Sequence, residues 1–117
     1  MGTIVNKRAV GSHKEQLAAE FLKDQGYLIR EMNFQCRSGE IDIVARDGRY
    51  LVFVEVKYRA DGRTGEPEEA VTIYKQNTIR KVARFYLLRH GFSEDTPCRF
   101  DVVGIKGETI RVTRNAF

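Results

Sequence analysis

The alternation of apolar and polar positions divides the first half of the chain into one helix and three strands. Apolar residues recur at helical spacing over residues 12–25, and Gly26 is placed to cap the end of this helix. Residues 27–34 are rich in apolar and aromatic side chains and predict a first strand. Residues 39–59 predict two further strands joined at Asp47-Gly48, a dipeptide typical of tight hairpin turns.

The second half of the chain predicts a loop, a second helix and two more strands. Residues 59–66 combine glycines with charged side chains and predict a loop. A helical pattern covers residues 67–90, and Gly91 closes it. Residues 99–105 and 109–112 predict the last two strands. The order helix, three strands, helix, two strands predicts an α/β fold in which a mixed β-sheet is flanked by helices.

Charged residues interrupt the hairpin far from its turn. If Asp47 and Gly48 form a two-residue turn, Glu40 lies opposite Glu55, and Asp42 becomes a diagonal neighbour of Glu55. Diagonal Cβ atoms lie on the order of 7 Å apart. Period-two alternation then places Lys57 on the same face as these carboxylates. The opposite face is an apolar surface made of Ile41, Ile43, Val52, Val54 and Val56.

This arrangement has two interpretations. Asp42 and Glu55 could share a divalent cation, because hard cations prefer oxygen ligands. Alternatively, Glu55 and Lys57 form an ordinary ion pair and Asp42 is solvated at an edge. Crowding of Glu40 with the other two carboxylates is destabilising without a cation, which favours the first interpretation. A loop of three residues would put Asp42 and Glu55 on opposite faces, so the metal site requires an even register.

Glu15 also has two interpretations. Ser12-His13-Lys14-Glu15 fits a capping box, in which Ser12 caps the helix and Glu15 reaches back to its N–H. Glu15 also lies three and four residues before Ala18 and Ala19 on the packed side of the helix, and so could face the carboxylate cluster.

Composition and charge restrict the class of protein. With 117 residues, 42% hydrophobic and 31% charged, the chain is expected to form a single globular domain over residues 1–117, with flexible ends at 1–10 and 114–117. The net charge of +4 permits contact with a polyanion. No apolar stretch is long enough for a membrane span, and no secretory signal is evident. Cys36 and Cys98 are interpreted as free thiols, which indicates a reducing, cytoplasmic location.

Four segments together resemble a known family: Gly11-x-x-x-Glu15, Gly39-Glu40-Ile41-Asp42, Phe53-Val54-Glu55-Val56-Lys57 and Arg99-Phe100-Asp101-Val102. They resemble the YraN family of small bacterial proteins, over nearly the whole chain. The pattern of that family is similar to archaeal Holliday-junction resolvases within the PD-(D/E)XK nuclease superfamily. The resemblance implies a restriction-endonuclease-like fold.

The resemblance also implies roles for individual residues. Asp42 and Glu55 would ligate Mg²⁺ or Mn²⁺, and the backbone carbonyl of Val56 would add a ligand. Lys57 would hold or polarise the attacking water, and Glu15 would complete the acidic site. The chain departs from the pattern at two positions beside Glu15. Gln16 replaces an Arg that is typical of the resolvases, and Lys14 replaces a Gly that is usual in the YraN pattern.

The second helix and the preceding loop supply candidates for contact with nucleic acid. Lys75 and Gln76 resemble polar positions that flank the metal site in the superfamily. Arg80 lies on a polar face that is either solvated or in contact with phosphate, and Arg59 begins a loop that could close over a phosphate backbone.

These observations lead to a hypothesis of a metal-dependent endonuclease that acts on DNA, including branched or junction DNA. The alternative is a nucleic-acid-binding module with a nuclease fold and little or no catalytic activity. An RNA-directed hydrolase is a third interpretation. Two cuts on a two-fold substrate would require a homodimer, as in the resolvases.

Overall fold

The computed structural model describes residues 7–59 and 71–117, and the side chains from His13 onward. The elements follow one another as a helix, three strands, a helix and two strands, which confirms the predicted α/β class. The predicted loop beyond Arg59 and the predicted first helical residues 67–70 lie outside the described residues. The elements are α1 (Lys7–Asp24), β1 (Leu28–Cys36), β2 (Gly39–Asp47), β3 (Tyr50–Arg59), α2 (Ile73–Arg89), β4 (Cys98–Lys106) and β5 (Thr109–Thr113).

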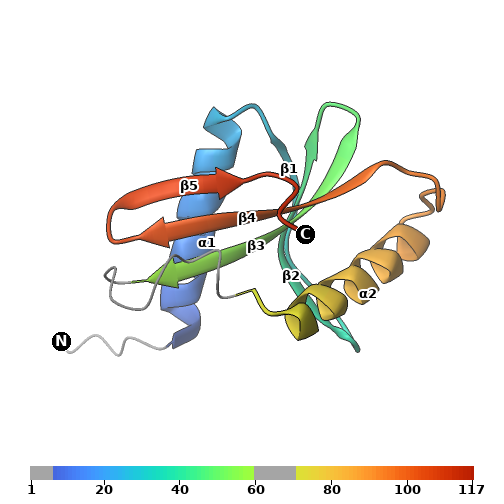
Figure 1. Ribbon diagram of the computed structural model, residues 1–117, viewed down its shortest axis with the longest axis horizontal. Helices are drawn as coiled ribbons and strands as arrows, with labels where there is room; N and C mark the ends of the chain where they lie inside the picture. The colour runs from blue at the N-terminus through green and yellow to red at the C-terminus, as the bar shows by residue number, and fades with distance from the viewer. Residues whose placement is uncertain (1–6, 60–70) are drawn as a thin grey trace.

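The five strands form one mixed sheet in the order β1-β2-β3-β4-β5 (Figure 1). Neighbouring strands are antiparallel except β3 and β4, which are parallel. A parallel pair needs a long connection from one end of the sheet to the other, and α2 lies in this connection. Among the described helices, none is long and apolar enough to cross a membrane.

The two helices cover opposite faces of the sheet, so there are two cores. Val52 and Val54 of β3 pack against α1, whereas Leu51 and Phe53 pack against α2. This alternation follows from the period of two along a strand. The α1 core contains Ala18, Ala19, Leu22, Tyr27, Ile43, Ala45, Val52, Val54, Val103 and Ile105. The α2 core contains Phe34, Ile41, Val44, Leu51, Phe53, Ile79, Val82, Ala83 and Tyr86.

The hairpin turn differs from the predicted one by one position. Asp47 pairs with Tyr50, so the two turn residues are Gly48 and Arg49 rather than Asp47 and Gly48. Gly48 has φ +61°, and it occupies the first turn position, where a positive φ is required. The turn keeps its even length, so the predicted side-chain parity is retained within the ladder from Ile43 to Asp47 and from Tyr50 to Val54. The ladder ends at the pair of Ile43 with Val54, so Asp42 and Glu55 lie just beyond the regular pairing on which their predicted diagonal geometry was based.

Two further predictions about this hairpin were wrong. Ile41 belongs to the α2 core and not to the face of Ile43, because regular pairing between β2 and β3 ends at Ile43 and Val54. Glu40 does not lie opposite Glu55. It pairs with Gln35 of β1, whose Nε2 donates to Glu40 Oε2 at 2.8 Å.

Gly39 at the start of β2 is required by the close approach of α2. A Cβ at this position would lie 3.0 Å from Cγ2 of Thr78 and 3.5 Å from Cγ2 of Val82, and its φ is +149°. A glycine therefore lets α2 pack closely on the strand that carries Asp42.

The helix boundaries bear on the two interpretations of Glu15. Helix α1 already begins at Lys7, so Ser12 lies inside it and the predicted capping box is wrong. The C-terminal end at Gly26 is confirmed, with φ +96°. Helix α2 begins later than predicted, because Thr72 is its N-cap and accepts a hydrogen bond from the backbone N of Lys75 at 3.2 Å.

Asp101 forms the centre of a buried polar network. Its side chain is fully buried and accepts from the Tyr27 hydroxyl at 2.6 Å and from Arg99 Nε at 2.9 Å. Arg99 Nη2 also donates to Asp47 beside the hairpin turn, at 2.7 Å. The network therefore links the end of α1, the hairpin and β4.

The last residues, expected to be flexible, contact β4. The backbone N of Asn115 donates to Asp101 Oδ1 at 3.0 Å, and that of Ala116 donates to the carbonyl of Phe100 at 2.8 Å. The Phe117 ring stacks on Phe100 with centroids 5.3 Å apart.

We expect Asp101→Asn to lower the free energy of unfolding by about 3 kcal/mol, because it removes a charged acceptor and leaves Arg99 short of a partner in a buried site. Urea unfolding measures the change. The control is Asp95→Asn, at an exposed position. A loss below about 1 kcal/mol in Asp101→Asn would mean that the network contributes little to stability.

Candidate active site in the fork between β2 and β3

The candidate site lies where β2 and β3 separate. Their ladder runs from the turn to Ile43 and Val54, and beyond it the beginning of β2 runs toward α2 while β3 continues away from it (Figure 1). In this fork Oδ2 of Asp42 accepts a hydrogen bond from the backbone N of Val56 at 2.8 Å. The Asp42 side chain thus satisfies a backbone donor where regular pairing has ended.

Asp42 and Glu55 are both buried, with relative exposures of 8% and 6%. Ionised carboxylates are costly to bury unless they are paired or hold a cation. The interpretation of Asp42 as a solvated edge residue is therefore wrong.

Two lysines approach Glu55. Nζ of Lys57 lies 3.5 Å from Oε1 of Glu55, and Nζ of Lys75 lies 3.8 Å from the same oxygen. The ion pair between Glu55 and Lys57 that the sequence suggested is present. Both separations exceed ordinary hydrogen-bond lengths, so the oxygen retains capacity to bind another group.

Burial, as the largest cause, and the charge of neighbouring Glu55 together raise the pKa of Asp42 to about 7. Repulsion from Glu40 adds to this effect, while the hydrogen bond from Val56 and the charge of Lys75 oppose it. The carboxylate pair is thus short of positive charge at neutral pH despite the two lysines.

Glu15 of α1 belongs to the same electrostatic cluster. Burial raises its pKa, and the charge of Asp42 raises it further. Its Oε2 is buried and has no hydrogen-bond partner among the described residues. An unpartnered buried carboxylate oxygen is an available ligand for a cation or for water bound to one.

Asn33 of β1 is a site residue that the sequence analysis missed. Its side chain interacts with Glu15 in a way that lowers the pKa of Glu15 and partly offsets the effect of burial. Asn33 has φ +55°, a left-handed conformation that asparagine adopts more readily than most residues. An asparagine within an otherwise strand-like segment was the available signal.

Lys14 of α1 packs beside the cluster. Its ammonium lies 4.1 Å from the centroid of the Tyr58 ring, a cation–π contact between α1 and β3. Lys14 therefore provides a contact between the helix that carries Glu15 and the strand that carries Lys57.

The other predicted nucleic-acid contacts have mixed surroundings. Gln76 Nε2 donates to the carbonyl of Val71 at 3.1 Å, which supports the start of α2. Arg59 lies at the end of β3, where one guanidinium nitrogen donates to the Tyr58 carbonyl at 3.2 Å and the buried Nε has no partner among the described residues. Arg80 donates to Asn77 at 3.2 Å and lies beside Phe117, away from the pairs that surround Glu55.

The oxygen donors of the fork are of the chemical type that a divalent cation prefers. The two carboxylates would be its main ligands. Within residues 7–59 and 71–117, no group of three or more His, Cys, Asp or Glu side chains is arranged to hold a metal ion together. Asp42, Glu55 and the Val56 carbonyl are hard oxygen donors, which suit Mg²⁺ or Mn²⁺. The unpartnered oxygen of Glu15 is consistent with the same use.

The fold and the fork define a small α/β protein with buried carboxylates and lysines gathered at one point of a mixed sheet. The chain belongs to UPF0102, a family described as uncharacterised, whose model matches residues 14–105. This match confirms the predicted relationship to the YraN family.

Curated relatives from several bacteria share this family name. A UPF0102 protein of Lachnoclostridium phytofermentans is 55% identical over 113 residues, which cover 97% of this chain and 96% of the relative. One from Symbiobacterium thermophilum is 54% identical over 85% of this chain and 83% of the relative. One from Caldicellulosiruptor saccharolyticus is 42% identical over 97% of this chain and all of the relative, 100%.

The raised pKa of Asp42 predicts a pH-dependent stability of the metal-free protein. The stability associated with the protonated carboxyl is fully present below its unfolded pKa of about 4, and it is lost as the pH rises through about 7. Asp42→Asn keeps an acceptor for the Val56 N–H without the charge. In EDTA, we expect its free energy of unfolding relative to wild type to increase by about 2 kcal/mol between pH 5 and pH 8.

Chemical denaturation of both proteins at several pH values measures this difference. Glu20→Gln, at an exposed position on α1, is the control. Its free energy of unfolding relative to wild type should not change with pH. A flat difference for Asp42→Asn as well would contradict a carboxyl that titrates near neutral pH.

Proposed function

We propose that this protein is a metal-dependent endonuclease that hydrolyses phosphodiester bonds in DNA, with branched or junction DNA among its substrates. The observation that carries the proposal is the buried pair Asp42 and Glu55, which faces two lysines in the fork. Carboxylates that bind a cation, next to an ammonium group that can contact a phosphate, form a site suited to phosphoryl transfer.

In this proposal Asp42 and Glu55 hold Mg²⁺ or Mn²⁺, together with the carbonyl of Val56. When bound, the cation supplies Lewis-acid activation of the phosphate and of water. Glu55 keeps the Lys57 ammonium close at 3.5 Å, from where it orients the attacking water and balances charge that develops on the phosphate. Glu15 completes the acidic site, directly or through a water molecule.

Several cations support binding of a polyanion near this site. Lys75 follows the N-cap Thr72 and reaches Glu55, while Arg59 ends the strand that carries Glu55 and Lys57. The net charge of +4 supports the same interpretation. Two symmetric cuts in a four-way junction would require a homodimer.

One observation favours the alternative of a nucleic-acid-binding module with little or no catalysis. The described residues hold no metal-binding group of three side chains, so the cation would depend on two carboxylates and the backbone. An RNA substrate is a further alternative, which the same assay tests.

We expect the purified protein to nick or cut a plasmid, a flap or a four-way junction in the presence of Mg²⁺ or Mn²⁺. Asp42→Asn and Glu55→Gln should each lower the cleavage rate at least about 100-fold, because each removes a charged ligand. Glu20→Gln also removes one carboxylate charge, from an exposed position on α1, and should cut at the wild-type rate. Circular dichroism verifies that each variant is folded.

Two outcomes would contradict an endonuclease acting on DNA. Binding without cleavage, with either metal and every DNA substrate, would favour the binding module. Cleavage confined to RNA would assign the site to the RNA-directed alternative.

A further inference from the structure

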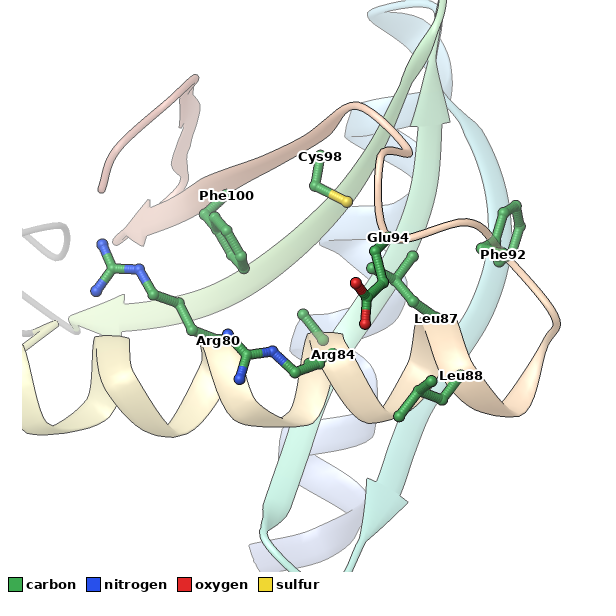
Figure 2. A pocket seen from close by; sticks show the side chains of 9 residues that line it. Arg80, Arg84, Leu87, Leu88, Phe92, Glu94, Cys98 and Phe100 are labelled. Carbon is green, nitrogen blue, oxygen red and sulfur yellow. The ribbon is translucent and has the colours of Figure 1, made fainter.

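A groove outside the fork lies between α2 and the beginning of β4. It has a volume of about 500 Å³, and the segment between α2 and β4 closes one end. Figure 2 shows the Phe100 ring and the Glu94 carboxylate directed toward α2, which carries Arg80 and Arg84 on the facing side. The groove therefore combines an aromatic surface, two cations and one anion.

The aromatic surface is continuous with a stack of rings. Phe100 stacks on Phe53 with centroids 5.7 Å apart and on Phe117 with centroids 5.3 Å apart. The guanidinium carbon of Arg80 lies 5.4 Å from the Phe117 centroid and 6.0 Å from that of Phe100. A planar cation beside an aromatic ring is a surface on which a nucleobase can stack.

Arg84 supplies an available cation. It is exposed and makes no hydrogen bond or ion pair within the described part of the chain. Its guanidinium can donate two parallel hydrogen bonds to a phosphate.

Glu94 distinguishes this groove from a simple anion site. A carboxylate disfavours a bare phosphate, but it can accept a hydrogen bond from the exocyclic amino group of a base such as cytosine. The arginines can bind a phosphate, the phenylalanine can contact the face of a base, and the glutamate can bind the edge of that base. Together these groups match one unpaired nucleotide. A volume of about 500 Å³ lies within the usual range of small-molecule sites.

The groove and the fork share helix α2. At about 1.5 Å per residue, Arg80 and Arg84 lie roughly 7.5 and 13.5 Å further along the helix axis than Lys75. An extended single strand with its phosphate near Lys75 could therefore reach the groove within about two nucleotides.

We propose that this groove binds an unpaired nucleotide of a DNA strand that passes through the fork, and that the substrate class is DNA with a single-stranded branch. The connection to a scissile bond rests on the proposed endonuclease function. Duplex DNA presents paired bases whose faces are stacked inside the helix, so it cannot fill the groove in this way.

Binding in EDTA tests the groove separately from cleavage. Fluorescence anisotropy is measured with the full chain, a short fluorescein-labelled oligodeoxycytidine and a blunt duplex of the same length. We expect Arg84→Ala to weaken single-strand binding about tenfold, and Phe100→Leu about fivefold, with little change in duplex binding. Lys81→Ala removes the same charge from an exposed position of α2 outside the groove lining, and should change single-strand binding less than about twofold. Thermal melting confirms the fold of each variant.

Equal losses in Arg84→Ala and Lys81→Ala would overturn the proposal, because they would show dependence on charge alone. Cleavage of plain duplex without affinity for the single strand would overturn the groove and leave the endonuclease intact. Single-strand affinity that depends on Arg84, in a protein that never cleaves, would support the groove and reject the endonuclease.

Discussion

The hydrogen bond from the backbone of Val56 to Asp42 is the interaction on which the site depends. It occupies the position where pairing between β2 and β3 has ended, and it satisfies a donor that the separating strand leaves behind. Because the two strands part here, groups from both faces of the sheet can meet. Glu15 approaches from α1 and Lys75 from α2, and both interact with the carboxylates of the fork.

The electrostatics of the fork is unfavourable in isolation, which is why the surrounding structure must hold it in place. Asp42 and Glu55 are buried side by side, and their mutual repulsion adds to the cost of desolvation. β3 pairs with β4, and the network around Asp101 links β4 to Tyr27 and to Asp47 beside the hairpin turn. A rigid scaffold allows acidic groups to remain close when relaxation would separate them.

The features that the sequence predicts depend on neighbouring residues. Most features that it does not predict depend on contacts between segments far apart in the chain. Alternation and turn residues were sufficient for the element order and for the even length of the hairpin turn. The predicted turn of the hairpin was wrong by one residue. Gly48 occupies the first turn position, and Asp47 remains in the strand, where it binds Arg99. The separation of β2 from β3 moved Ile41 to the other core. Asn33 interacts with Glu15, and Tyr27 with Asp101. These contacts join segments far apart in the chain, so the pattern of apolar and polar residues does not predict them.

The central claim is that the fork binds a divalent cation, and calorimetric titration with Mn²⁺ tests it most directly. The account predicts saturable binding to the wild-type protein, retained in Glu94→Gln and lost in both Asp42→Asn and Glu55→Gln. Absence of binding at millimolar Mn²⁺, or equal affinity in wild type and Asp42→Asn, would contradict it.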